Sequence, residues 1–170
     1  MQLTTRRLLL REFSPSDVMT LSVYQATPSY REHDAARADA ETIVGQAILW
    51  SEEQPRWNYQ LAIAESETSL AIGAIGLRGM DHALGEAEFG CELDPAYWGR
   101  GYAREAAVTL LGFGFRVLKL RRVIAVCAIA NSRVHHLLES LGFTREPNPI
   151  GSAAVRFTLA NSEAAESGNG

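Results

Sequence analysis

The sequence has few cysteines, no long hydrophobic run and little excess charge of either sign. Its two cysteines, Cys91 and Cys127, form neither a Cys-x-x-Cys pair nor a Cys/His cluster with zinc-site spacing. Both lie in apolar, strand-like stretches, so we predict two buried thiols in a reducing compartment and no metal site. No apolar run is long enough to span a membrane, and no signal-peptide pattern opens the chain, which together predict a cytoplasmic protein with no membrane partner.

The net charge of −4 over 170 residues argues against nucleic acid as a partner. A mildly acidic surface suits a cationic substrate such as an amine, whereas an anionic ligand needs a local cluster of basic or N–H groups. Hydrophobic residues make up 46% and charged residues 21% of the chain, which is ordinary for one globular domain. We predict a single domain over residues 1–160, followed by a small, polar, disordered tail at 161–170.

Hydrophobic periodicity and turn residues predict an α/β fold in which strands and helices alternate irregularly. A first helix is expected from about Ser14, as N-cap, to residue 26, and residues 27–38 are expected to form a loop or irregular helix. Gly142 is expected to end the last helix. The predicted strands are 4–11, 57–65, 70–78, 86–93, 123–128, and a closing hairpin from residue 143 onward with 154–159. The other predicted helices are 39–51, 102–118 and 131–141.

The turn between the predicted strand 86–93 and the long helix after it is the most informative segment. It reads Trp98-Gly99-Arg100-Gly101-Tyr102-Ala103-Arg104. Glycines let an anion approach the backbone closely, and a helix N-terminus adds N–H groups and a positive dipole end, so the turn can hold a pyrophosphate. It is not a dinucleotide fingerprint, because Arg104 stands where the third glycine is needed. A plain helix start made of turn residues is the alternative.

This turn resembles the acetyl-CoA motif of the GNAT superfamily of N-acetyltransferases, whose pattern is Gln/Arg-x-x-Gly-x-Gly/Ala. Gly101 and Ala103 match the pattern, while Trp98 stands where Gln or Arg is usual. That departure is similar to the Tyr-Trp-Gly-Lys-Gly-Tyr-Ala of ribosomal-protein N-terminal acetyltransferases of the RimJ/RimL type. Further segments that resemble this branch are Thr5-Arg6-Arg7-Leu8-Leu9-Leu10-Arg11, Ala87-Glu88-Phe89-Gly90 and the helix from Asn131 to Leu141-Gly142-Phe143.

The resemblance implies a GNAT fold: one mixed, mostly antiparallel sheet split around the acetyl-CoA site and flanked by about four helices. It implies that the strand before the turn splays from the next strand and pairs its backbone with the pantetheine arm, one N–H polarising the thioester. It also makes a homodimer possible. Asn131 is equally explained as a plain helix N-cap. The residues implied to contact acetyl-CoA are Cys91, Leu93, Trp98, Gly99, Arg100, Gly101, Tyr102, Ala103, Arg104 and Asn131.

Three glutamates, Glu86, Glu88 and Glu92, share one face of the predicted strand 86–93. GNAT enzymes often carry the general base on this strand, which implies Glu88 as the first candidate and Glu92 as the second. If the three carboxylates are buried together, their repulsion raises the pKa of at least one. Solvated edge charges or a structural salt bridge are the alternative.

The general acid has no obvious candidate. Where related sequences carry a serine or a thiolate-protonating tyrosine, this chain has Val134 and Leu138. Either another group protonates the CoA thiolate, the thiolate leaves unprotonated, or activity is low. His135 and His136 lie nearby but are expected to be structural. Trp57, Tyr59 and residues 30–33 are candidates for lining an acceptor pocket, with core packing as the alternative for the first two.

We predict an N-acetyltransferase that moves acetyl from acetyl-CoA to a primary amine by direct attack in a ternary complex. The amine must be neutral, and an α-amine near pKa ~8 reaches that form at a cost about 3 kcal/mol lower than lysine near ~10.4. A peptide α-amine or a small amine of low pKa is therefore favoured. The alternatives are an inactive CoA-binding sensor or interaction module, and a GNAT enzyme acting on an antibiotic or a polyamine.

Overall fold

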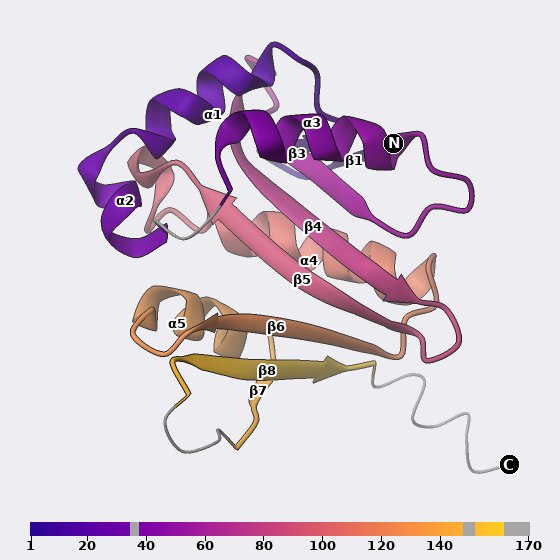
Figure 1. The fold of residues 1–170 in the computed structure, drawn as a ribbon. Coiled ribbons are helices and arrows are strands. Elements are labelled where there is room, and N and C mark those ends of the chain that lie inside the picture. The colour runs from indigo at the N-terminus through magenta and orange to yellow at the C-terminus, as the bar shows by residue number, and fades with distance from the viewer. Residues whose placement is uncertain (35–37, 148–151, 162–170) are drawn as a thin grey trace, which may run out of the picture.

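A computed structural model describes residues 1–34, 38–147 and 152–161 of the chain. Its eight-stranded sheet has the order β1-β2-β3-β4-β5-β6-β8-β7. All neighbouring strands are antiparallel except β5 and β6, which are parallel (Figure 1). The predicted fold class, a mixed and mostly antiparallel sheet flanked by helices, is confirmed, and the described residues form five α-helices.

The strands are β1 (Gln2–Thr4), β2 (Leu8–Arg11), β3 (Tyr59–Glu65), β4 (Ala71–Asp81), β5 (Glu86–Leu93), β6 (Arg122–Ala128), β7 (Thr144–Arg145) and β8 (Ala154–Ala160). The helices are α1 (Asp17–Gln25), α2 (Pro28–Asp34), α3 (Ala40–Ser51), α4 (Tyr102–Arg116), α5 (Ser132–Ser140) and the short 3₁₀ helix η1 (Pro95–Tyr97). The predicted closing hairpin is confirmed, with β8 between β6 and β7.

The two faces of the central strands differ in residue size. Alternation along β3 and β4 places Leu61, Ile75 and Leu77 on one face, where they share a core cluster with residues of α4. Ala62 and Ala74 lie on the other face and pack with residues of α1 and α3. Figure 1 shows α1 and α3 on the near side of the sheet and α4 behind it. The small residues therefore bring the near helices close to the sheet.

The sheet splits between β5 and β6. The two strands pair only where Glu86–Glu88 face Arg122–Ile124, whereas β6 continues to pair with β8 as far as Ala128. In Figure 1 the two strands lie together at one end and diverge toward the other, and α5 lies beside the open end. The expected split in the sheet is present, at the strand that precedes the glycine turn.

The N-terminal strand is shorter than predicted. A single strand over residues 4–11 is wrong, because a turn at Thr5 separates β1 from β2. The Thr5 hydroxyl accepts a hydrogen bond from the Leu8 N–H at 2.8 Å, and the Thr5 N–H donates to the Leu8 carbonyl at 2.9 Å. The threonine side chain thus stabilises a turn that an apolar pattern alone does not reveal.

The predicted N-cap at Ser14 is also wrong, because α1 begins at Asp17. The Asp17 carboxylate accepts the Ser14 N–H at 2.8 Å and forms two hydrogen bonds with the Arg11 guanidinium at 2.8 Å each. Asp17 is buried, and this paired arginine satisfies its charge. Asp17, the first residue of the helix, is thus fixed by contacts with residues three and six positions before it.

Smaller boundary differences occur elsewhere. β3 begins at Tyr59 rather than at residue 57, and β4 extends to Asp81 because its pairing with β5 resumes after an irregularity. Residues 28–34 of the predicted loop or irregular helix form α2. Of the predicted tail, Asn161 donates its N–H to the Arg121 carbonyl at 2.9 Å, and residues 162–170 lie outside the described part.

Candidate active site

The glycine turn leads directly into α4. Gly99 and Gly101 have φ angles of 72° and 78°, and Gly101 is the N-cap of the helix that begins at Tyr102. No other atom lies within 4 Å of the place that a Cβ on Gly99 would take. Backbone N–H groups at a glycine turn and in the first turn of a helix can bind a phosphate, and the helix dipole favours its charge.

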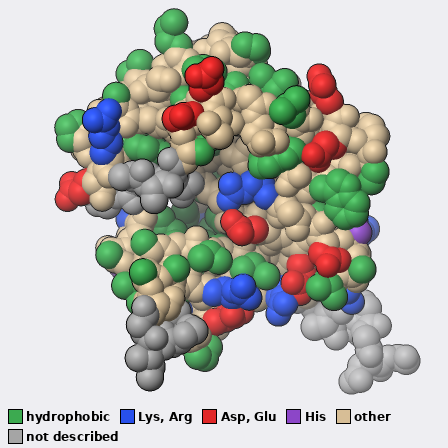
Figure 2. Space-filling model, viewed as in Figure 1, with side chains coloured by type: hydrophobic (Ala, Val, Ile, Leu, Met, Phe, Trp, Pro, Cys, Tyr) green, Lys and Arg blue, Asp and Glu red, His purple; other side chains and the backbone are tan. Residues whose placement is uncertain are grey.

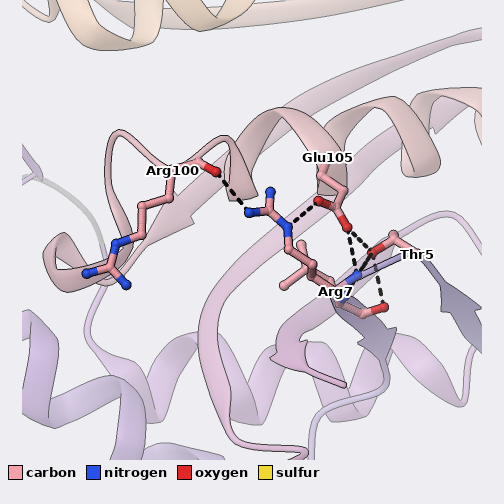
Figure 3. Close-up of polar contacts among 5 residues, drawn as sticks. Thr5, Arg7, Arg100 and Glu105 are labelled. Carbon is pink, nitrogen blue, oxygen red and sulfur yellow. Dashed lines mark hydrogen bonds and ion pairs between the residues drawn. The ribbon is translucent and has the colours of Figure 1, made fainter. Parts of the chain in front are cut away.

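A cluster from the N-terminal turn holds this loop in place (Figure 3). Glu105, in the first turn of α4, accepts hydrogen bonds from the Thr5 hydroxyl at 2.6 Å, the Arg7 N–H at 2.9 Å and Arg7 Nε at 2.8 Å. Arg7 Nη1 also donates to the Arg100 carbonyl at 3.1 Å, and its guanidinium lies 4.2 Å from the centre of the Tyr102 ring. Sequence reasoning missed Arg7 and Glu105, because their contact joins segments nearly a hundred residues apart.

The same hydrogen bonds shift the pKa of the Glu105 carboxyl. Burial alone raises the pKa of its carboxyl, but the bonds from Thr5 and Arg7 favour the charged form more strongly. The net effect is a pKa below the ordinary value for glutamate. Glu105 is therefore a charged anchor for the loop rather than a candidate acid.

A cavity of about 190 Å³, which we call the donor cavity, runs from the glycine turn to β5. Eight of the ten residues predicted to contact acetyl-CoA line it: Cys91, Leu93, Trp98, Gly99, Gly101, Tyr102, Ala103 and Arg104. Arg100 and Asn131 do not. The structure thus brings the predicted set together around one space, with two exceptions.

The exceptions have other contacts. The Arg100 guanidinium lies 5.8 Å from the centre of the Tyr97 ring, and in Figure 3 its side chain points away from the Arg7–Glu105 cluster. Asn131 caps α5, accepting the Val134 N–H at 3.2 Å through its side-chain oxygen. The alternative explanation of Asn131 as a helix cap is therefore confirmed, and a contact of either residue with the donor stays a prediction.

Trp98 replaces the usual Gln or Arg of the motif, and its surroundings restore a positive charge. Its indole N–H donates to the Leu93 carbonyl at 2.8 Å, which fixes the ring against β5. The guanidinium of Arg133, from α5, lies 3.3 Å from the ring centre and lines the donor cavity. Sequence reasoning missed Arg133, which no local pattern marks.

The edge of β5 faces the split. The Asp94 N–H donates to the Ile72 carbonyl at 2.8 Å, on the β4 side. Since backbone groups alternate in direction along an antiparallel ladder, those of Cys91 and Leu93 point away from β4, toward the gap. Cys91 and Cys127 lie on the two sides of this gap and are only half-buried, so the prediction of two buried thiols is wrong.

The three glutamates of β5 are not buried together. Glu86 pairs with Arg122, and Glu88 pairs with Arg78 at 3.2 Å with its side chain 54% exposed. Glu92 is 6% exposed. Each carboxylate therefore has its own environment, because α1 and α2 cover only the end of the strand that carries Glu92.

Glu92 is held by two tyrosines. The Tyr24 hydroxyl, from α1, donates to one carboxylate oxygen at 2.6 Å, and the Tyr30 hydroxyl, from α2, donates to the other at 2.9 Å. The two rings meet edge to face with centres 5.5 Å apart. Of the predicted 30–33 segment, Tyr30 thus reaches the site, where both tyrosines fix the position of the carboxylate. Sequence reasoning missed this role of Tyr24.

A second cavity of about 280 Å³, which we call the acceptor cavity, lies on the α3 side of β5. Helix α3 contributes Thr42, Gln46 and Trp50, the sheet contributes Gln60 and Arg78, and Cys91 and Glu92 line both cavities. In Figure 2 this face of the molecule is hollowed at its centre, beside a basic and an acidic side chain. Two separate spaces therefore meet at the same two residues of one strand.

The other predicted pocket residues lie elsewhere. Trp57 packs against His82 with ring centres 4.6 Å apart and ring planes inclined at 60°. Tyr59 packs against Phe113 at 5.5 Å, on the α4 face of the sheet. The candidate assignment of Trp57 and Tyr59 to the pocket is wrong for the acceptor cavity. Alternation along β3 explains it, since Gln60, not Tyr59, faces α3.

Helix α5 presents no hydroxyl at the two positions considered. Val134 lines the donor cavity and Leu138 is buried in the core. His135 donates to the Ala128 carbonyl at 3.1 Å, and His136 donates to the Ser132 carbonyl at 2.7 Å, so both contact backbone. Among the described residues there is no group of three or more metal-ligating side chains, and none of their helices is long and apolar enough to cross a membrane.

The comparisons with known proteins agree with this geometry. A family model described as an acetyltransferase (GNAT) domain matches residues 7–144. The uncharacterised N-acetyltransferase p20 of Bacillus licheniformis is 30% identical over 152 residues, covering 85% of this chain and 83% of p20. The crystal structure of an acetyltransferase from Agrobacterium tumefaciens has a TM-score of 0.77 at 25% identity, covering 95% of each chain.

A Vibrio cholerae spermidine N-acetyltransferase, solved in complex with CoA and spermine, has a TM-score of 0.75. The match covers 93% of this chain and 98% of that one. At 17% identity it shows that the two proteins share a fold.

Proposed function

Because the chain belongs to the acetyltransferase (GNAT) family, whose acetyl donor is acetyl-CoA, we propose that it acetylates a primary amine by direct attack while both substrates are bound. The observation that supports this most is the wall between the two cavities. The donor cavity and the acceptor cavity lie on different sides of β5 and share Cys91 and Glu92. A thioester entering from one side and an amine from the other meet at these residues.

The donor side supplies what acetyl-CoA requires. The N–H groups of the turn at 99–104 bind the pyrophosphate, and Arg104 and Arg133, which line the cavity, add positive charge. The pantetheine arm extends along the edge of β5 as an additional strand, pairing with the backbone groups of Cys91 and Leu93. An N–H group of that edge polarises the thioester carbonyl.

Glu92 is better placed than Glu88 to accept the proton of the amine. It lines both cavities, whereas Glu88 lines neither and pairs with Arg78 on the surface. The amine nitrogen attacks the thioester carbon, the C–N bond forms and the C–S bond breaks. The proton lost by nitrogen passes to the Glu92 carboxylate, directly or through one water. Glu88, the first candidate from sequence, is thus the second candidate here.

The CoA thiolate leaves without help from α5, where Val134 and Leu138 carry no hydroxyl. A thiol has a pKa near ~8.5, so its thiolate is a good leaving group and takes a proton from water. The lack of these hydroxyls is therefore compatible with turnover.

Two resemblances suggest the class of the acceptor amine. The motif resemblance to the RimJ/RimL type favours an α-amine, and the spermidine acetyltransferase of the same fold offers a polyamine as the second candidate. The cytoplasmic location, the homodimer, the lack of a nucleic-acid partner and the RimJ/RimL branch stay predictions.

The test combines thermal unfolding with an assay for free CoA thiol. Acetyl-CoA at about one hundred times its dissociation constant adds roughly 2.7 kcal/mol of stability, which raises Tm by roughly 5–10 °C for a domain of this size. A rise in Tm together with amine-dependent thiol release supports the proposal. A rise without release for any amine indicates the CoA-binding sensor instead, and no rise at saturating acetyl-CoA contradicts both.

A further inference from the structure

Gln60 and Gly90, which line the acceptor cavity, belong to a cross-strand row that contains a second glycine, Gly76. Gln60 of β3 faces Gly76 of β4, and Gly76 faces Gly90 of β5. Alternation along the strands places Arg78 and Glu92 on the same face of the sheet as this row. The glycines leave a depression in the sheet, which two long polar side chains fill.

Gln60 fills the first glycine position. Its side-chain oxygen occupies the space that a Cβ on Gly76 would take, and the residue is 8% exposed. This oxygen is buried and has no hydrogen-bond partner among the described residues, while Gln60 also lines the acceptor cavity. A buried polar atom without a partner costs stability, so a sequence optimised only for folding would favour an apolar side chain here. Turning the amide over presents either its oxygen or its N–H groups to a ligand.

Arg78 fills the second glycine position. Its Nη2 lies where a Cβ on Gly90 would be, so the guanidinium extends across β5 and lines the cavity. One oxygen of Glu88 accepts from Nη2 at 3.2 Å. A guanidinium carries five N–H groups, so this exposed carboxylate does not saturate it.

The cavity therefore carries opposite charges on one face. The Glu92 carboxylate lies at the end where the two cavities meet, and the Arg78 guanidinium lies over Gly90, two residues back along β5. Two residues of a strand span about 6.6 Å, which is the scale of a small molecule. Gln60 lies beside the guanidinium end, in the Gly90 row.

We propose that the acceptor is a small primary amine that also bears a carboxylate, with Gln60 and Arg78 as the residues that select it. The inference rests on the proposed function, since it places the amine at Glu92. The carboxylate of the substrate then accepts hydrogen bonds from the N–H groups of Arg78 and of the Gln60 amide. The planar guanidinium is well suited to bind a carboxylate in this way. A polyamine would instead bring its second ammonium group against Arg78, so this chain discriminates against polyamines.

The experiment measures kcat/KM with saturating acetyl-CoA for ω-amino acids from glycine to 6-aminohexanoate, for the corresponding amides, and for spermidine. At the chain length that fits, the acid is expected to exceed its amide and spermidine at least tenfold. Arg78→Met is expected to remove that preference. Arg122→Met, which breaks a similar arginine–glutamate pair outside both cavities, is expected to keep it.

Gln60→Met separates recognition from folding. Because it removes a buried oxygen that has no partner, Tm is expected to stay the same or rise, while kcat/KM for the best acid falls threefold or more and the KM for acetyl-CoA stays unchanged. A fall in Tm with no change in kcat/KM would assign Gln60 a structural role and contradict the proposal.

The outcomes also separate this inference from the proposed function. Acetylation in which spermidine or the amides equal or exceed the acids at every length overturns the inference and leaves the enzyme assignment intact. An acid preference that survives Arg78→Met also overturns it. If no acid of the series is acetylated although acetyl-CoA raises Tm and a peptide α-amine is acetylated, the inference is overturned and the proposed function stands. If neither the series nor peptide α-amines are acetylated, the proposed function fails, and the inference fails with it.

Discussion

The donor and acceptor sides of β5 are built by different means. The donor side depends mainly on backbone: two glycines with positive φ, the start of α4 and a strand edge turned toward a gap. The acceptor side depends on side chains that come from α1, α2, α3, β3 and β4. A backbone site tolerates most side chains and fails when a Cβ blocks it, whereas a side-chain site changes with single substitutions. The donor side can thus be shared by a family while the acceptor side varies.

The largest effect is expected at Gly101. Gly101→Glu adds a Cβ at a left-handed position and a negative charge beside the phosphate site, so the rise in Tm with acetyl-CoA should disappear. Gly79→Glu is the control, since Gly79 also has positive φ, at 58°, and lies in open space far along β4. It should lower stability by a similar amount and keep the acetyl-CoA response. Loss of the response in both variants would mean that backbone strain, not the site, is being measured.

The next effect distinguishes the two carboxylates of β5. Glu92→Gln keeps an oxygen for the tyrosine hydroxyls but cannot accept the proton, so kcat should fall by about 10²–10⁴-fold with little change in the KM for acetyl-CoA. Glu88→Gln should change kcat less than threefold. The measurement is steady-state thiol release for both variants. If Glu88→Gln has the larger effect, the base is Glu88 and the role assigned to the shared wall is wrong.

A smaller effect is expected where Glu92 is held. Tyr30→Phe removes one of its two hydroxyl donors, and a lost hydrogen bond to a charged group is worth about 1.5–3 kcal/mol. The substitution should lower kcat by roughly tenfold and leave acetyl-CoA binding intact. Tyr24→Phe, which removes the other donor, should behave in the same way. A change in the KM for acetyl-CoA without a change in kcat would contradict the separation of the two sides.

Substitution in the ion pair of Arg11 and Asp17 is expected to leave the rate of acetyl transfer unchanged. The pair lines neither cavity but stabilises the fold. Burial raises the pKa of Asp17, but the hydrogen bonds from Arg11 and Ser14 lower it by more than burial raises it. The pKa in the folded protein therefore lies below the ordinary 3.8. This stabilisation is present above the unfolded pKa and is lost as pH falls through the folded value. The Tm difference between the protein and Asp17→Asn should thus be largest near pH 6–7 and shrink below about pH 4. A difference independent of pH would contradict this.

Much of the lining of the donor cavity could be predicted from the sequence because most of the predicted residues are contiguous. Residues 98–104 carry the turn, the glycines and the helix start in one short segment, and eight of the ten predicted contacts line one cavity. Arg133 and Arg7 escape the same reasoning, since each reaches the turn from an element distant in sequence. A site formed by neighbouring residues can be predicted from a sequence, whereas contacts formed by tertiary packing cannot.

The acceptor side could not be predicted for this reason. Alternation places Glu88 and Glu92 on the same strand face and cannot rank them. The difference arises because α1 and α2 bring Tyr24 and Tyr30 over Glu92 alone. Gln60 likewise belongs to no motif, and the role proposed for it depends on a glycine that faces it from the neighbouring strand.

Acetyl-CoA bound in the split between β5 and β6 would become a structural component of the sheet. The sheet is continuous across this boundary through only three residue pairs, from Glu86↔Arg122 to Glu88↔Ile124. A pantetheine arm paired with β5 would occupy the opening as a strand contributed by the ligand, tying the portion from β6 to β8 to the rest of the sheet. Amide hydrogen exchange in that portion should therefore slow when acetyl-CoA binds, because local opening becomes coupled to release of the ligand. In each catalytic cycle, the portion from β6 to β8 would then become more stable when acetyl-CoA binds and less stable when CoA leaves.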